Sequence, residues 1–201
     1  KKRELTVTGY AEFTNNSNYE QDKVNLQYSQ YITQTVFRGN RVRQMIHANL
    51  DRLEEGENID NKNVFNRFFG LAGADVNSWC GDKESFLGRY HGYNNPEGVI
   101  TGKLSNKGNY NENSCGALST VLSLAPGETK EIIFLVGMKD DAEAGEIVEH
   151  YKNCQEVCKR ELEELIEYWH GQLSHFQIRT PSPEFNTMIN TWNAYNCFIT
   201  F

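Results

Sequence analysis

Five histidines are the first side chains to consider as general bases or metal ligands, and they are scattered along the chain: His47, His91, His150, His170 and His175. No two of them have the spacing of a helical metal site. The sequence also lacks a glycine-rich phosphate loop and the Gly-x-Ser-x-Gly pattern of serine hydrolases. Each histidine is therefore better explained as a surface or hydrogen-bonded side chain than as a catalyst, and we predict no metal site.

Carboxylates in the first half of the chain offer a second kind of chemistry. Glycoside hydrolysis uses a pair of Asp or Glu side chains on either side of the scissile bond. Candidates for such a pair are Glu12, Glu20, Asp22, Asp82 and Glu84. Nothing in their spacing brings any two within reach, so the residues themselves indicate no self-contained active site.

The five cysteines are spread widely and are odd in number, which favours reduced thiols over a disulfide framework and a cytoplasmic location. Cys154 and Cys158 have helical spacing, but two ligands make only half of a metal site. Because both fall on an apolar stripe, we interpret them as small hydrophobic side chains.

Charge is distributed unevenly. The chain has 20 basic and 27 acidic residues, a net charge of −7, and the acidic excess lies between Asp140 and Tyr168. This segment is interpreted as a solvated helical face. An acidic balance argues against nucleic acid as a partner, and the sequence has neither an apolar run long enough to span a membrane nor a basic-then-apolar secretion leader.

Before residue 138 the pattern is that of strands and loops. Strands are expected at residues 5–13, 24–37 (with a bulge near Ser29), 42–48, 67–72, 119–124 and 131–137. The turn signal Ala125-Pro-Gly-Glu128 predicts that the last two strands form an antiparallel hairpin. Asparagine is concentrated in the loops of this half; it favours turns, and beside aromatic residues its amide also suits sugar hydroxyls.

After residue 138 the apolar period becomes helical. A short helix is expected at 141–151, capped by Asp140 or Asp141, and a longer one follows with an apolar stripe from Cys154 to Leu173. A third helix is expected to begin at Ser182-Pro183-Glu184. We expect its aromatic residues Trp192 and Tyr195 to pack between this helical linker and a following helical domain rather than to stack on sugar. Because the sequence stops inside this apolar helix, we expect the chain to be a fragment of a longer protein.

Five segments, taken in order, carry a family resemblance: Tyr10-Ala-Glu-Phe13, Asn25-Leu-Gln-Tyr-Ser29, Cys80-Gly-Asp-Lys-Glu-Ser-Phe-Leu-Gly-Arg-Tyr90, Leu124-Ala-Pro-Gly-Glu128 and Met188-Ile-Asn-Thr-Trp-Asn-Ala-Tyr-Asn-Cys197. Their content and order resemble glycoside hydrolase family 94, the inverting disaccharide phosphorylases such as cellobiose, chitobiose and laminaribiose phosphorylases. The resemblance covers nearly the whole chain.

The resemblance implies a mainly β fold with α elements. It predicts part of an antiparallel β-sandwich (a supersandwich) at 1–138, a helical linker at 139–180, and the first helix of an (α/α)6 catalytic barrel at 181–201. The change of period near residue 138 agrees with this mapping.

The resemblance also implies a reaction. The family cleaves a β-glycosidic bond with inorganic phosphate and gives an α-sugar 1-phosphate; one carboxylic acid protonates the leaving oxygen, and phosphate replaces the second carboxylate. Phosphate is a co-substrate, and no cofactor is implied. The acid of the family lies in a barrel loop near a Trp-Asn-Asp-Cys pattern that this chain does not contain, so no catalytic residue is assigned.

Sugar-contacting residues can still be carried over from the sandwich. By resemblance, Asn25, Gln27 and Tyr28 are substrate-binding candidates on the acceptor side, and the subunits are expected to pair as homodimers. Some relatives have an arginine where Tyr28 falls, which leaves the acceptor sugar open. The plainer alternative is that Leu26 and Tyr28 form an apolar strand face.

Two further functions stay open. The chain could belong to a non-catalytic β-sandwich module that binds carbohydrate, or to a structural sandwich used for dimer contacts. A downstream barrel with the Trp-Asn-Asp-Cys pattern would separate the phosphorylase from both.

Overall fold

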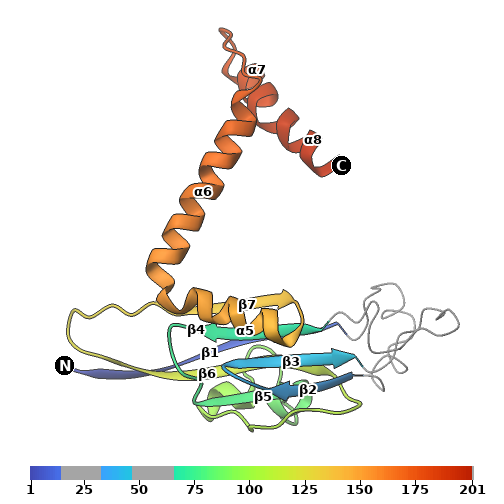
Figure 1. Cartoon of the computed structure of the whole chain (residues 1–201), viewed down its shortest axis with the longest axis vertical. Helices are drawn as coiled ribbons and strands as arrows, with labels where there is room; N and C mark the ends of the chain where they lie inside the picture. The colour runs from blue at the N-terminus through green and yellow to red at the C-terminus, as the bar shows by residue number, and fades with distance from the viewer. Residues whose placement is uncertain (15–32, 47–65, 201) are drawn as a thin grey trace, which may run out of the picture. The chain divides into compact units, whose positions relative to one another are not determined.

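A computed structural model of the chain describes residues 1–14, 33–46 and 66–200 (Figure 1). The chain divides into two compact units, Lys1–Cys154 and Gln155–Phe201. The first unit holds all the described strands, and each unit is described by itself below.

Seven described strands form two antiparallel sheets in the first unit. The three-stranded sheet has the order β1-β6-β5, and the four-stranded sheet has the order β2-β3-β4-β7. The strands are β1 (Arg3–Glu12), β2 (Thr33–Phe37), β3 (Arg41–Ile46), β4 (Arg67–Ala72), β5 (Ser78–Asp82), β6 (Ser114–Leu124) and β7 (Ile133–Met138).

The core lies between the two sheets. Val42, Phe69 and Leu71 from the four-stranded sheet pack with Phe13 and Leu118 on the side of the three-stranded sheet. The rings of Phe69 and Phe134 stack with their centroids 5.5 Å apart. Alternation along the strands produces this core, because successive side chains point to opposite faces.

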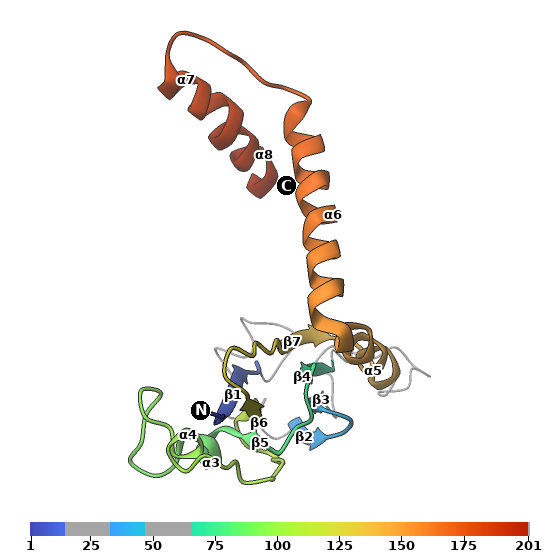
Figure 2. The same ribbon diagram turned by 90° about the vertical axis from the view of Figure 1, so that its left-hand side faces the viewer.

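Helices cover the outer face of each sheet (Figure 2). Ala144 and Val148 of α5 (Asp141–His150) pack on Phe68 of β4. On the other side, Phe86 and Leu87 of α3 (Lys83–Leu87), together with Leu104, pack on Cys80 and Cys115. The short helix α4 (Glu97–Ile100) follows α3 on this side. Helical segments therefore cover part of the outer face of each sheet, and the core lies between the two sheets.

Strand β4 lies between α5 and the inter-sheet core, and all six of its residues are buried. Phe68 faces α5 and Phe69 faces the inter-sheet core, so both faces of the strand after Arg67 are apolar; Arg67 itself is buried and donates to Gln44 Oε1 at 3.0 Å. This agrees with the apolar run from which the strand was predicted. The expected strands at 5–13 and 42–48 are confirmed in their described parts as β1 and β3.

The predicted hairpin between residues 119 and 137 is wrong. The turn exists, with Gly127 at φ 79° and the Glu128 backbone N–H donating to the Ala125 carbonyl at 3.1 Å. Its two flanking strands, however, belong to different sheets: β6 pairs with β1 and β5, whereas β7 pairs with β4. The segment 125–132 crosses between the sheets, which a local turn signal does not reveal. Of the predicted strand at 24–37, the structure describes β2; Ser29 lies outside the described residues.

Helices predicted after residue 138 are present. Asp140 caps α5 by accepting from the Glu143 backbone N–H at 2.9 Å. The 3₁₀ turn η1 (Tyr151–Asn153) leads into α6 (Cys154–Ser174). Ser182 caps α7 (Pro183–Thr187) through the Phe185 N–H at 3.3 Å. The helix then continues as a π-helical segment, η2 (Met188–Asn193), and as α8 (Ala194–Thr200).

Apolar side chains of the second unit are largely exposed. Leu162 and Leu165 of α6 are about half exposed, and the acidic residues Glu163, Glu164 and Glu167 are exposed as predicted. Trp192 and Tyr195 are exposed as well, with exposed fractions of 58% and 53%, and their packing between linker and barrel stays a prediction for the whole protein. Among the described helices, none combines the length and the apolar character needed to cross a bilayer.

Candidate functional site

The three substrate-binding candidates taken from the sequence, Asn25, Gln27 and Tyr28, lie outside the described residues. The described histidines and acidic residues form no group of three that could hold a metal ion. The four cysteines with described side chains, Cys80, Cys115, Cys158 and Cys197, are free thiols. A candidate site must therefore be sought among the other polar and aromatic residues.

The described carboxylates of the predicted acid–base set are held by different partners. Asp82 accepts from the Ser85 backbone N–H at 2.8 Å and caps α3. A hydrogen bond with Asp82, reinforced by its charge, raises the pKa of Glu112. Glu12, at the end of β1, is bound by Lys83 and Tyr93. Among the described members of the set, Glu12 and Asp82 thus have different partners, and Glu84 lies in the first turn of α3; Glu20 and Asp22 lie outside the described part.

Glu12, Lys83 and Tyr93 form a polar and aromatic group that we call the Tyr93 cluster. The Tyr93 hydroxyl donates to Glu12, with distances of 2.9 Å to Oε1 and 3.2 Å to Oε2. The Lys83 ammonium forms an ion pair with the same carboxylate and lies 5.4 Å from the centroid of the Tyr93 ring. Two regions distant in sequence therefore meet here: the end of β1, and α3 with the loop that follows it.

Two aromatic rings support this cluster: Phe86 is buried and Tyr10 is partly buried. Tyr10 contacts the Tyr93 ring edge to face, at a centroid distance of 6.4 Å, and stacks on Phe86 at 4.4 Å. Burial raises the pKa of Tyr10 well above its usual value, and the neighbouring Cys115 and Glu12 act in the same direction. Burial alone would lower the pKa of Lys83, but its hydrogen bonds with Glu12 and Tyr93 raise it. The cluster consequently keeps a protonated amine beside an acceptor carboxylate.

The loop that carries Tyr93 has an ordered backbone. Gly88 ends α3 at φ 82°, and its N–H donates to the Glu84 carbonyl. Gly92 and Asn95 then bond to each other twice: the Gly92 N–H donates to Asn95 Oδ1 at 3.2 Å, and the Asn95 N–H donates to the Gly92 carbonyl at 3.1 Å. These bonds fix the backbone on both sides of Tyr93, so its ring position does not depend on side-chain contacts alone.

Tyr90 in the same loop is fully exposed and has a left-handed backbone, with φ 64°. A bulky residue pays about 1–2 kcal/mol in this conformation. We expect Tyr90→Gly to raise the free energy of unfolding by about 0.5–1 kcal/mol, because the strain is relieved and no buried contact is lost, while the entropy of glycine offsets part of the gain.

Thermal denaturation of the full-length protein would measure this change. Tyr90→Ala is the matched control, since it removes the ring but keeps a Cβ at positive φ, and it should change stability by less than about 0.5 kcal/mol. A Tyr90→Gly variant less stable than Tyr90→Ala would contradict the strain argument.

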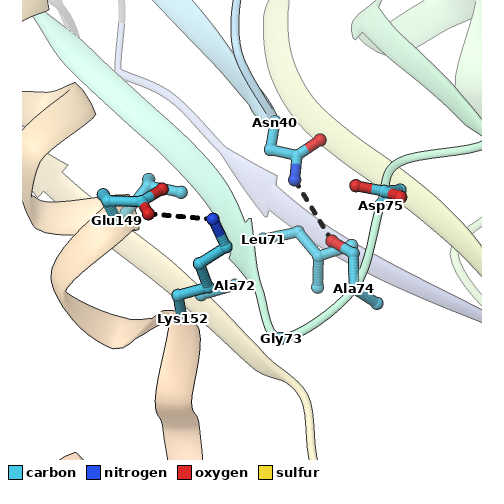
Figure 3. A pocket seen from close by; sticks show the side chains of 9 residues that line it. Asn40, Leu71, Ala72, Gly73, Ala74, Asp75, Glu149 and Lys152 are labelled. Carbon is cyan, nitrogen blue, oxygen red and sulfur yellow. Dashed lines mark hydrogen bonds and ion pairs between the residues drawn. The ribbon is translucent and has the colours of Figure 1, made fainter.

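A pocket of about 330 Å³ lies between the end of β4 and α5 (Figure 3). Asn40 closes one side by donating to the Ala74 carbonyl at 3.1 Å, and Lys152 forms an ion pair with Glu149 at 2.9 Å. Asp75 adds a second carboxylate, so the charged lining is one lysine against two acids. Phosphate would be repelled here, and the polar groups serve to hold the turn after β4.

A second pocket of about 320 Å³ lies under α3 and α4, lined by Cys80, Phe86 and Leu104 among others. The Cys80 thiol is fully buried and receives a hydrogen bond from the Ser105 hydroxyl at 3.2 Å. A hydrogen bond from Cys115, supported by that of Ser105, lowers the pKa of Cys80 to about 7 although burial opposes the shift. Because the sulfur has no exposed surface, this pocket offers a ligand no nucleophile.

The second unit contains a pocket of about 290 Å³ between α6 and the last helices. Its walls are mainly apolar and include Trp169, Leu173 and Phe176. The Trp169 ring meets Phe198 edge to face at 4.9 Å. The residues that line this pocket pack α6 against the last helices within the second unit, and they include no acid–base pair.

Sequence reasoning did not identify Lys83 and Tyr93 as partners of Glu12. One signal did point to this place, namely the combination of tyrosine and asparagine in His91-Gly-Tyr-Asn-Asn-Pro96, a composition compatible with carbohydrate contact. Among the described residues, the Tyr93 cluster is the arrangement with the features of a polar-ligand site.

Comparison with protein families gives two matches. Residues 1–154 match "Glycosyl hydrolase 94, supersandwich domain", and residues 168–201 match "Glycosyl hydrolase 94 superfamily, catalytic domain". The antiparallel two-sheet fold agrees with the first match.

Three characterised relatives illustrate the similarity. An N,N'-diacetylchitobiose phosphorylase of Vibrio proteolyticus is 28% identical over 96% of this chain and 22% of its own length. A cyclic beta-(1,2)-glucan synthase of Rhizobium meliloti is 27% identical over 64% of this chain and 4% of its own length. A 3-O-beta-D-glucopyranosyl-beta-D-glucuronide phosphorylase of Paenibacillus borealis is 28% identical over 58% of this chain and 15% of its own length. The chain thus spans about a fifth of the length of the chitobiose phosphorylase.

Proposed function

Because the chain belongs to glycosyl hydrolase family 94, we propose that it is part of an inverting glycoside phosphorylase. The whole protein would cleave a β-linked, glucose-type disaccharide or oligosaccharide with inorganic phosphate and release an α-sugar 1-phosphate. One observation carries the proposal: a chitobiose phosphorylase aligns with 96% of the chain. A second Vibrio species has a chitobiose phosphorylase that aligns over the same share.

The proposed reaction has one proton donor and one nucleophile. A phosphate oxygen attacks the anomeric carbon while the bond from that carbon to the glycosidic oxygen breaks on the opposite face. A carboxylic acid gives its proton to the leaving oxygen. The phosphate oxygen supplies the electron pair for the new bond, so the reaction needs no cofactor.

In this proposal the chain supplies scaffold and positioning, and the catalytic acid comes from another part of the protein. Residues 1–138 would be sandwich, 139–180 a helical linker, and 181–201 the first helix of an (α/α)6 barrel. The separate matches of residues 1–154 to a supersandwich domain and of residues 168–201 to a catalytic domain support a change of domain in the second half of the chain. We further propose a cytoplasmic homodimer whose substrates are oligosaccharide and phosphate.

The direct experiment incubates the full-length protein with phosphate and a panel of β-linked disaccharides, and follows the sugar 1-phosphate by NMR. The α-anomer is the expected product, and the 201-residue chain alone should release none. A β-anomer would overturn the inverting mechanism. Sugar phosphate released by the 201-residue chain would overturn the assignment of the catalytic acid. Sugar binding without any product would favour a carbohydrate-binding module instead.

Asn25, Gln27 and Tyr28 are proposed to contact the acceptor sugar. Asn25→Ala and Gln27→Ala in the full-length enzyme should each raise KM for the disaccharide about tenfold with a smaller change in kcat, because each loses a hydrogen bond to a ground-state hydroxyl. Asn153→Ala, at an exposed position in η1, is the matched control and should leave both constants unchanged. Unaltered acceptor kinetics in both variants would rule out the contact.

A further inference from the structure

We propose that the Tyr93 cluster binds a β-linked oligosaccharide, with a sugar ring stacked on Tyr93 and its hydroxyls bonded to Glu12 and Lys83. The class of ligand in this inference rests on the proposed function. The position of the binding site rests on the geometry of the cluster. Asn25, Gln27 and Tyr28 play no part in it.

The ring of Tyr93 is open to solvent and yet held in position. Its exposed fraction is 60%, while its hydroxyl is fixed on Glu12 and its edge-to-face partner Tyr10 is half buried. An aromatic side chain that is already ordered loses little conformational entropy when a ligand stacks on it. The exposed ring is therefore suited to contact the C–H face of a pyranose.

The polar atoms beside the ring match sugar hydroxyls, which both donate and accept. The carboxylate of Glu12 accepts several hydrogen bonds and its side chain is 43% exposed, so it can accept from a hydroxyl as well as from Tyr93. Lys83 has three donors, and its side chain keeps 24% exposure beside the ion pair. One acid and one base together carry no net charge, which suits a neutral ligand.

Other classes of ligand fit this surface less well. A nucleic acid would approach a protein of net charge −7 and find one lysine already paired with Glu12. The exposed loop residues Asn94 and Asn95, which follow Tyr93 in the chain, are polar, and they favour a ligand with hydroxyl groups over an apolar protein or membrane contact. Small polar rings with hydroxyl groups remain the best match.

Fluorine NMR provides a test that reports on this place alone. The full-length protein is labelled with 3-fluorotyrosine, and the Tyr10 and Tyr93 resonances are assigned by their loss in Tyr10→Phe and Tyr93→Phe. Chitotetraose and cellotetraose are then titrated without phosphate. The Tyr10 and Tyr93 resonances should shift saturably with a common Kd for at least one of the two sugars, while that of Tyr110, an equally exposed tyrosine (61%), should not move.

Variants then separate stacking from hydrogen bonding. With Tyr10 as the reporter, Tyr93→Ala should raise Kd about tenfold, whereas Tyr93→Phe keeps the ring and should stay within about threefold. Tyr110→Ala is the control and should leave Kd unchanged. Melting temperatures would verify that the variants are folded.

Each outcome decides the question. Unshifted Tyr93 and Tyr10 resonances with both sugars, or an unchanged Kd in Tyr93→Ala, would overturn the inference even if the enzyme releases sugar phosphate. Dissociation of an oligomer in Tyr93→Ala without any change in sugar binding would identify a protein contact and also overturn it. Conversely, saturable shifts at Tyr93 in a protein that forms no sugar phosphate would support this site while the proposed function fails.

Discussion

Asp141→Asn should destabilise the sandwich unit by about 3 kcal/mol, because it leaves buried guanidinium groups without a counter-charge. Asp141 begins α5 and binds Arg38, Arg41 and Arg43. Arg41 and Arg43 have only 8% of their side-chain surface exposed, and they come from β3 under the helix. Arg41 also donates to the Asp141 carbonyl at 2.8 Å. The single carboxylate therefore joins helix α5 to the four-stranded sheet.

Arg38→Ala is the matched control. Arg38 pairs with the same carboxylate but its side chain is 70% exposed, so its loss should cost less than about 1 kcal/mol. Chemical denaturation of the full-length protein, followed by a probe in the sandwich, would measure both changes. Equal effects of Asp141→Asn and Arg38→Ala would contradict the role given to the buried arginines.

Acidification should weaken the ion pairs between Asp141 and the three arginines. Burial of Asp141 opposes its ionisation, but hydrogen bonds from Arg41 and Arg38 and the charge of Arg43 outweigh it and lower the pKa of Asp141. A carboxyl group with a lowered pKa contributes stability above its unfolded pKa of about 3.9, and this is lost as pH falls through the folded value. Wild-type protein should lose this increment below about pH 4, and Asp141→Asn should lack it.

Gly116→Val should destabilise the sandwich by about 3 kcal/mol through overpacking between the sheets. A Cβ at Gly116 would lie 2.4 Å from Cβ of Phe69 and 2.9 Å from Cζ of Phe13. The Phe69 Cβ is attached to the backbone of β4, so no change of rotamer moves it away. To remove this clash, β6 and β4, which belong to different sheets, would have to move apart.

The control adds volume to the same strand on an open surface. Val121 is 47% exposed in β6, and Val121→Ile should change the free energy of unfolding by less than about 0.5 kcal/mol. Thermal or urea denaturation monitored by circular dichroism would compare the two. A Gly116→Val protein as stable as Val121→Ile would show that the sheets can part at little cost.

Strands whose burial is symmetric, and helices with a cap, could be predicted from the sequence. The run Phe68–Ala72 of β4 is apolar on both faces, and Asp140 and Ser182 mark the helix starts that the structure confirms. Strand β5 was missed because its five residues include a glycine and two polar residues, and its pairing with β6 is supplied from far along the chain. The prediction of a β6–β7 hairpin was wrong because both strands pair with partners far along the chain. A turn signal between two strands does not determine which sheet each strand joins.

The Tyr93 cluster could not be predicted from the sequence. Glu12 and Tyr93 are 81 positions apart, and their contact depends on where β1 ends and how the loop after α3 folds. Asp82 at the N-cap, with Glu84 in the first turn, was a usable signal for the start of α3 and hence for the location of Lys83. Composition pointed to the loop, but only the fold brings the carboxylate to it.

Complete burial of β4 has a consequence for the motions of the first unit. The backbone of this strand is bonded to β3 on one side and β7 on the other, and both of its faces are covered. Its peptide groups can meet solvent only when the layers above and below come apart together. Opening of β4 is therefore equivalent to global unfolding of the sandwich, whereas the exposed first residues of β1 can fray without consequence for the rest.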